Sequence, residues 1–189
     1  MDQSVFNHGI EPLKEHYRNA CEQILDDMPE PLGRSVATTV YVDASHATNK
    51  MTRGSHSGYV LFVNKAPISW YSKRQNTVES SPFSSEFIAM KTCMESIHAL
   101  RYKLRMFGVP VNDATRVLCD NESVVKNSSS LASTLNKNHS SIAFHLARWA
   151  VAAGGILIGW IPTNFNIADS FIKCHSAHKR DALFGSWTY

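Results

Sequence analysis

The chain has 189 residues, of which 43% are apolar, and this length accommodates one domain with a substantial core. Such a composition excludes wholesale disorder, and a net charge of +3 is compatible with a polyanionic partner without establishing one. Four cysteines without a CxxC pair argue against a disulfide framework or a zinc ribbon, and no apolar run approaches the roughly 18 residues that span a bilayer. We therefore expect an intracellular protein with no membrane partner.

The N-terminal residues 1–36 are polar and include the breaker cluster PEPLG at 29–33. We expect them to form a lead-in segment rather than a core element, with at most a short helix within 16–25. Runs rich in β-branched and aromatic residues then predict three strands, the last two joined by a tight hairpin. These strands lie at 37–42, 58–63 and 67–71.

A long helix is expected from Phe87, because apolar residues recur at helical spacing as far as Phe107. Gly108 and Pro110 end it, as a glycine C-cap followed by proline does. A strand, a short helix, a serine-rich loop, a helix, a strand and a final helix follow. We place them at 117–119, from about Asn121, 127–133, 142–153, 156–161 and 167–172. The order β-β-β-α-β-α-α-β-α predicts an α/β fold with a mixed sheet of about five strands.

Four acids stand at the ends of these elements. Asp43 ends the first strand and Asp120 ends the fourth. Glu86 lies in the first turn of the long helix, and Asp169 in the first turn of the last helix. Each acid alone is explained by capping or by the preference of acids for helix N-termini, and for Asp120 alone capping is the favoured interpretation.

The four positions together support a different interpretation. If the two strands are neighbours and both helices start near the same edge, the carboxylates converge, and their repulsion requires divalent cations. Oxygen-only ligation indicates Mg²⁺ or Mn²⁺ rather than zinc. Two such ions roughly 4 Å apart can activate a water and stabilise the leaving oxygen in phosphodiester cleavage.

Five stretches carry more specific information. They read YVDASHA, ISWYSKRQNTVESSPFSSEFIAM, LCDNESVV, HSSIAFHLARW and WIPTNFNIADSFIK. Over about residues 37–173 the chain resembles the ribonuclease H domain of Ty1/copia-type LTR retrotransposon polyproteins. The SKRQ-T-V segment before the glutamate helix is typical of copia elements rather than of cellular ribonucleases H.

The resemblance implies a ribonuclease H-like fold over residues 37–175. Its mixed five-stranded sheet has three antiparallel strands followed by parallel strands, with helices packed on both faces. Residues 1–36 would be the tail of the preceding reverse-transcriptase region, and 176–189 a C-terminal tail. The implied partners are an RNA–DNA hybrid and the reverse-transcriptase region of the same polyprotein, in a cytoplasmic particle or in the nucleus.

The resemblance also implies an activity, the hydrolysis of the RNA strand of RNA–DNA hybrids. In that family two divalent ions, Mg²⁺ or Mn²⁺, are held by catalytic acids. Matched position by position, these acids are Asp43, Glu86, Asp120 and Asp169.

The chain departs from the family pattern at two places, and it lacks the histidine loop that many cellular ribonucleases H carry before the last aspartate. Ser45 replaces the second acid of the usual D-A-D motif, and residues 172–175 read IKCH where the family commonly has T-K-P-L. No histidine occurs within 162–166, so no proton-shuttle histidine is assigned there.

Substrate contacts are expected from side chains that flank the acids, because a hybrid-binding groove touches phosphates through Lys, Arg and helix N-termini. The candidates are Lys73, Arg74, Gln75, Asn121, Ser123, Lys126, Lys137 and His139. For Lys73 and Arg74 the alternative is a solvated loop, and for Asn121 and Ser123 it is helix capping.

Other side chains are assigned to structural roles. Arg101, Lys103 and Arg105 are expected on the polar face of the long helix, and His145 in the core. The apolar stripe of the second helix is expected to carry Ile142, Leu146, Trp149 and Ala153. Trp70, Trp149 and Trp160 are assigned to the core rather than to base stacking.

Two rival functions remain open. The same fold could serve as a catalytically inactive, hybrid-binding or scaffolding module of a decayed retroelement, against which the four intact acids argue. It could also carry the chemistry of an integrase or another nuclease, against which the copia-type stretches argue.

Overall fold

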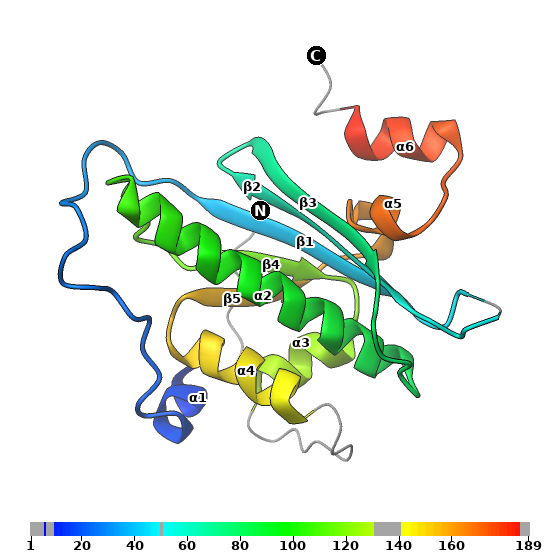
Figure 1. Cartoon of the computed structure of the whole chain (residues 1–189), viewed down its shortest axis with the longest axis horizontal. Helices are drawn as coiled ribbons and strands as arrows, with labels where there is room; N and C mark the ends of the chain where they lie inside the picture. The colour runs from blue at the N-terminus through cyan, green and yellow to red at the C-terminus, as the bar shows by residue number, and fades with distance from the viewer. Residues whose placement is uncertain (1–5, 7–9, 50, 131–140, 186–189) are drawn as a thin grey trace.

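The computed structural model describes residues 6, 10–49, 51–130 and 141–185. Its centre is a five-stranded sheet in the order β3-β2-β1-β4-β5 (Figure 1). The strands are β1 Thr38–Ser45, β2 His56–Val63, β3 Ala66–Arg74, β4 Thr115–Cys119 and β5 Ile156–Trp160. β1, β2 and β3 pair antiparallel, and β4 pairs parallel with both β1 and β5. The predicted mixed sheet is confirmed.

Helices cover both faces of the sheet, as predicted. They are α1 Ile10–His16, α2 Pro82–Met106, α3 Glu122–Ser129, α4 Ser141–Ala152, α5 Asp169–Ile172 and α6 Ala177–Phe184, with the short 3-10 turn η3 Thr163–Phe165. Alternate residues of β2 separate the two faces, because successive side chains of a strand point to opposite sides. Tyr59 and Leu61 join the main core with α2 and α4, whereas Val60 and Phe62 pack with Phe184 and its neighbours on the opposite side.

The long helix α2 begins five residues earlier than predicted. Ser81 caps it, since its hydroxyl accepts the backbone N–H of Ser84, and Pro82 occupies the first turn, where no N–H is needed. The apolar spacing used for the prediction is visible only from Phe87 onwards, so the polar first turn was missed. The end is as predicted, with Gly108 at φ +69 just beyond the helix.

Helix α4 presents a different face to the core than predicted. The buried residues are Ala143, Phe144, Ala147, Ala150 and Val151, while Ile142 is 78% exposed. Three alanines and Phe144, whose ring contacts that of Phe87 on α2, therefore form the contact face, in place of the predicted stripe.

Several side chains that were assigned to the core are in fact accessible. Trp70 is 68% exposed because β3 is an edge strand, and Trp160 is 44% exposed at the end of β5. Trp149 is only partly buried. His145 is exposed, and its Nδ1 lies 2.8 Å from the Tyr17 hydroxyl.

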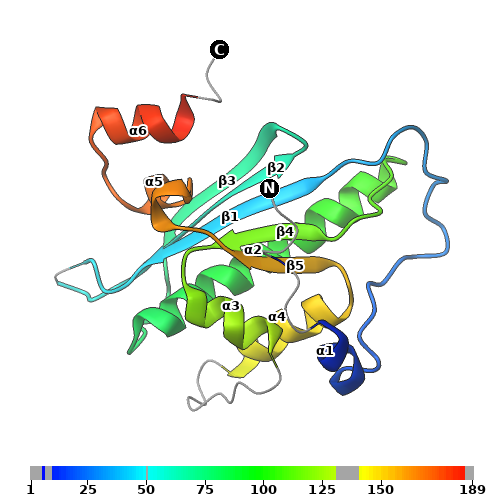
Figure 2. The ribbon, with the colours of Figure 1, turned by 180° about the vertical axis from the view of Figure 1, so that it is seen from behind.

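The lead-in residues contribute to the core, contrary to the sequence-based expectation. The helix forms at Ile10–His16, and Leu13 is fully buried in the main core. The segment between α1 and β1 then runs past the far end of α2 (Figures 1 and 2), where Leu32 N–H donates to the Gly108 carbonyl at 2.8 Å.

This segment also changes the surroundings of Arg101, which was expected on a solvated face. Glu22 accepts hydrogen bonds from Arg101 at 2.6 and 2.8 Å and from Arg105 at 2.8 and 2.8 Å. Arg101 is only 2% exposed. The assignment of 1–36 to a reverse-transcriptase tail stays a prediction.

The C-terminal tail contains the additional helix α6, which Ser176 caps through a hydrogen bond from the Lys179 N–H. Within the described part of the chain, none of the helices combines the length and the apolar character that crossing a membrane requires.

Candidate active site

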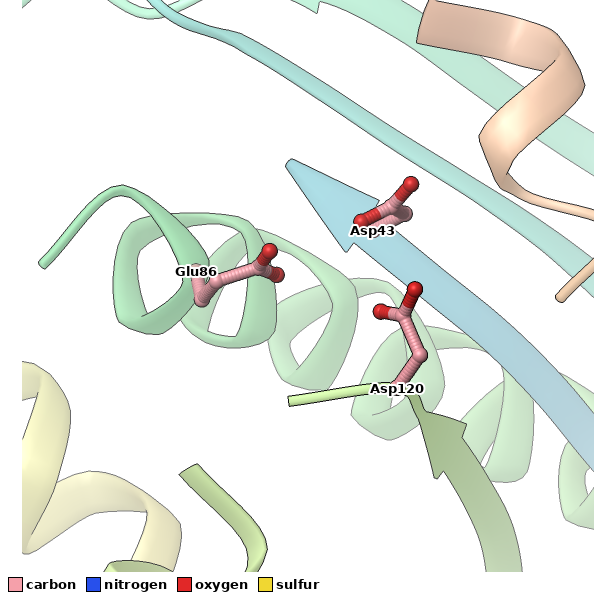
Figure 3. Close-up of side chains that lie close together, drawn as sticks. All are labelled: Asp43, Glu86 and Asp120. Atoms are coloured by element: carbon pink, nitrogen blue, oxygen red, sulfur yellow. The ribbon is translucent and has the colours of Figure 1, made fainter. Parts of the chain in front are cut away.

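Three of the four predicted acids converge at one edge of the sheet (Figure 3). β1 and β4 are parallel neighbours, so Asp43 in β1 and Asp120 after β4 reach the same edge. Glu86 comes from the second turn of α2, one turn later than predicted because the helix starts at Pro82. One carboxylate oxygen from each acid lies within 4.8 Å of those from the other two. We call Asp43, Glu86 and Asp120 the acidic triad.

The negative charge of the triad is unfavourable, because its carboxylates are close together and two of them are buried. Asp43 is 2% and Glu86 8% exposed. Burial, followed by the nearby charge of Asp120, raises the pKa of Asp43 to about 8. Burial, together with Asp43 and Asp120, raises the pKa of Glu86 well above its usual value. Three such carboxylates are stable together only with bound protons or a cation.

The donor set fits a hard divalent cation. All its atoms are carboxylate oxygens, which Mg²⁺ and Mn²⁺ prefer. Asp43 Oδ1 accepts the Ala44 N–H at 2.8 Å, whereas Asp43 Oδ2 is buried and accepts no hydrogen bond from the described residues. A buried carboxylate oxygen without a donor is what a metal ligand presents in the absence of its ion.

Asp169 lies outside the triad and is contacted by three basic side chains. Lys173 Nζ lies 2.6 Å from its Oδ1, and Lys179 Nζ and His175 Nε2 both lie 2.9 Å from its Oδ2. Although burial acts to raise the pKa of Asp169, hydrogen bonds from the two lysines lower it to about 2. Asp169 is the first residue of α5 and is 1% exposed. Its role as a metal ligand stays a prediction.

A glycine allows α5 to approach the triad. Gly58 pairs with Asp43 across β1 and β2. A Cβ atom at this position would lie 2.6 Å from Ile172 Cγ2 and 3.3 Å from the Ala168 carbonyl oxygen. Any larger residue would therefore push α5, with Asp169 and Lys173, away from Asp43.

Of the predicted substrate contacts that closely follow Asp120, one caps a helix and two have exposed side chains. Asn121 caps α3, because its Oδ1 accepts the N–H groups of Ser123 at 3.1 Å and Val124 at 3.2 Å. The capping alternative for Asn121 is thus confirmed. The Ser123 side chain is exposed, and Lys126 is 68% exposed and pairs with Glu122 at 2.9 Å.

The SKRQ segment, residues 72–75, likewise contains both exposed side chains and one that is bonded within the protein. Lys73 and Arg74 are exposed at the end of β3. Gln75 is 8% exposed, and its Nε2 donates to Ser57 Oγ at 2.9 Å and to the Ser85 carbonyl at 2.8 Å. Both hydrogen bonds of the Gln75 amide nitrogen are therefore made within the protein. One of them holds Ser85, the residue that precedes Glu86. The predicted substrate contact of Gln75 is not tested by these bonds.

A hydrogen-bond network extends from this point and was not foreseen from the sequence. Ser85 Oγ lies 2.9 Å from His46 Nδ1 and 3.0 Å from Ser55 Oγ. It ties the start of α2 to the loop after β1, so that Glu86 and Asp43 are held on a common frame. His139 and Lys137, the remaining substrate candidates, lie outside the described residues.

No protein-family model matches the chain. The retrovirus-related Pol polyproteins from transposons RE1 and RE2 of Arabidopsis thaliana are 24% and 23% identical to it over 141 residues, which is 75% of this chain. The chain spans only about 10% of the length of these curated relatives.

Several solved structures share the fold. RNase H1 from the archaeon Halobacterium salinarum has a TM-score of 0.55 and 14% identity, over 72% of this chain and 93% of that one. LC11-RNase H1, solved in complex with an RNA/DNA hybrid, has a TM-score of 0.57 and 16% identity, over 71% and 93%. A foamy viral protease-reverse transcriptase, also solved with an RNA/DNA hybrid, has a TM-score of 0.50 and 16% identity, over 82% and 22%.

These likenesses confirm two expectations. The chain has the ribonuclease H fold, and its homologues are retrovirus-related Pol polyproteins of retrotransposons. They confirm the resemblance on which the sequence-based assignment of the acids rests, and leave the assignment itself to experiment.

Proposed function

We propose that the chain is a metal-dependent ribonuclease H that hydrolyses the RNA strand of RNA–DNA hybrids. The observation that carries the proposal is the acidic triad, whose carboxylate oxygens lie within 4.8 Å of one another at one edge of the sheet. The ribonuclease H fold supports it, as do two similar structures that were solved with RNA/DNA hybrids.

Asp43, Glu86 and Asp120 would hold Mg²⁺ or Mn²⁺. When bound, such ions activate a water for attack on the scissile phosphate and stabilise the departing 3′ oxygen. The resemblance implies two ions, with Asp169 as the fourth ligand. The number of ions therefore depends on whether Asp169 leaves its basic neighbours Lys173, His175 and Lys179.

The chain's own polar side chains would bind the hybrid. Lys73 and Arg74 extend into solvent from the end of β3, where they can contact phosphates. Ser123 and Lys126 are exposed on α3, directly after the triad residue Asp120. Because the chain corresponds to a tenth of its relatives, we propose that the reverse-transcriptase region of the same polyprotein assists binding, inside the cell.

Cleavage of a labelled RNA–DNA hybrid in Mg²⁺, Mn²⁺ or chelator tests the proposal, with duplex DNA and duplex RNA as controls. We expect metal-dependent cutting of the RNA strand alone. Asp120→Asn should abolish it, because a triad oxygen loses its charge, whereas Asp113→Asn at an exposed position should not. An Asp120→Asn protein that cuts hybrids at the normal rate would refute the assignment.

One observation favours the second candidate, an inactive hybrid-binding or scaffolding module. Asp169 is fully engaged by basic side chains, as a decayed site would allow. A folded wild-type protein that binds the hybrid but cuts it in neither Mg²⁺ nor Mn²⁺ would establish this alternative.

A further inference from the structure

The side chain of Lys173 is placed between two buried carboxylates. Its Nζ lies 2.6 Å from Asp169 Oδ1 and 3.8 Å from Asp43 Oδ2. The two acid side chains are 2% and 3% exposed, whereas that of Lys173 is 45% exposed. An ammonium group therefore reaches from solvent into the gap between the triad and the fourth acid.

Lys173 lies where the negative charges of Asp43 and Asp169 need a positive counter-charge. Asp43 Oδ2 accepts no hydrogen bond from the described residues, and the Lys173 ammonium is the cation that pairs with it there. The other oxygen of Asp169 accepts a hydrogen bond from Lys179 and is also contacted by His175. Asp169 thus has no oxygen that is free of a basic partner in this arrangement.

A purely structural ion pair would not require this geometry. Lys179 already anchors α6 to Asp169, and Lys173 follows Asp169 by four residues at the end of α5. The additional approach of Lys173 to Asp43 does nothing for the packing of α6. It does place a positive charge where the two acids would otherwise repel each other.

We propose that Lys173 is an internal cation that takes the place of a second divalent ion between Asp43 and Asp169. Accordingly, the chain binds one divalent ion, on the acidic triad, and not two. The inference rests on the proposed metal-dependent function. A tethered ammonium has a high effective concentration at this position, so a free ion must displace it before Asp169 can become a ligand.

The test is a titration of the metal-free full chain with Mn²⁺. Calorimetry measures the affinity, and electron paramagnetic resonance counts the bound ions. The wild type should bind one ion. Lys173→Met should bind that ion on the order of tenfold more tightly, because a positive charge near Asp43 is removed. Lys173→Met with Lys179→Met should bind two ions, since Asp169 loses both of its lysines.

Lys91→Met is the matched control. Lys91 pairs with Glu95 at the same four-residue spacing and is 40% exposed, but its partner on α2 is not a member of the triad. Its ion count and affinity should equal those of the wild type. Lys173→Arg retains the charge and should also bind one ion, which supplies a test if the methionine variants do not fold.

The outcomes separate the two proposals. Two ions of similar affinity on the wild type, or an affinity unchanged by Lys173→Met, would overturn the role of Lys173. Failure of the wild type and of every folded variant to bind Mn²⁺ would instead overturn the metal-dependent function itself.

Discussion

Replacement of Glu22 by glutamine should destabilise the whole domain, although Glu22 precedes the first strand. Its carboxylate accepts four hydrogen bonds from Arg101 and Arg105, at distances from 2.6 to 2.8 Å. Glutamine has the same shape but no charge, and it can accept through only one oxygen. Arg101, 2% exposed, would then lack a full counter-charge, which is the expensive way to break a buried pair.

The pKa of Glu22 gives the magnitude. Burial acts to raise it, but the two guanidinium groups lower it from 4.5 to about 2. At 1.36 kcal/mol per pH unit this difference corresponds to about 3 kcal/mol. The side chain is 16% exposed, and solvent screening reduces the expected loss to about 2–3 kcal/mol at pH 7.

The pH dependence follows from the direction of this pKa change. Because the folded-state pKa lies below the unfolded-state value, the stabilisation is fully present above about pH 4.5 and is lost as the pH falls towards about 2. The difference between the wild type and Glu22→Gln should therefore shrink to less than half at pH 3.

Urea unfolding followed by circular dichroism measures both effects. With a slope of about 2 kcal/mol per molar urea, the midpoint should fall by about 1 M at pH 7. Glu95→Gln is the control, since Glu95 is 59% exposed in a surface pair and its loss should cost less than about 0.5 kcal/mol. An unchanged midpoint for Glu22→Gln, or a difference that does not depend on pH, would refute the reasoning.

The remaining predictions concern the site and the domain boundary. In chelator, Asp43→Asn should raise the free energy of unfolding by about 1–2 kcal/mol, because triad repulsion is relieved; a lower thermal midpoint would contradict this. Gln75→Ala should cost about 1–3 kcal/mol and slow cleavage at unchanged hybrid affinity, whereas weaker hybrid binding at unchanged stability would support the predicted substrate contact. Lys73→Ala with Arg74→Ala should reduce the slope of log affinity against log salt by about 1 per removed cation, and an unchanged slope would indicate a solvated loop. Removal of residues 1–36 should lower the urea midpoint more than Glu22→Gln does, because the core then also loses Leu13; an equal midpoint for the full and shortened chains would restore the lead-in interpretation.

The elements of the sheet and the acids at their ends were predictable because their signals are local. A run of β-branched residues indicates a strand. Once the strand is placed, the acid that follows it is placed as well. The capping role of Asn121 was predictable for the same reason, since it depends on the two residues that follow. The convergence of Asp43 with Asp120 needed the additional assumption that β1 and β4 are neighbours, which the structure confirms.

The parts that were missed depend on contacts between distant segments. Glu22 meets Arg101 across 79 positions of the chain, and neither residue carries a local sign of the other. The exposure of Trp70 follows from β3 being an edge strand, which is a property of the sheet order and not of the strand's composition. The four-residue spacing of Asp169 and Lys173 was visible in the sequence, but the approach of Lys173 to Asp43 was not.

Gly58 provides a further criterion for deciding whether a related sequence has an intact site. The spacing between the triad and α5 is set by a residue that has neither a side chain nor a charge. A single mutation there could separate Asp169 from the triad while every acid remains in the sequence. Retention of the four acids is therefore an insufficient criterion for an intact site, and the residue opposite the first aspartate should be inspected with them.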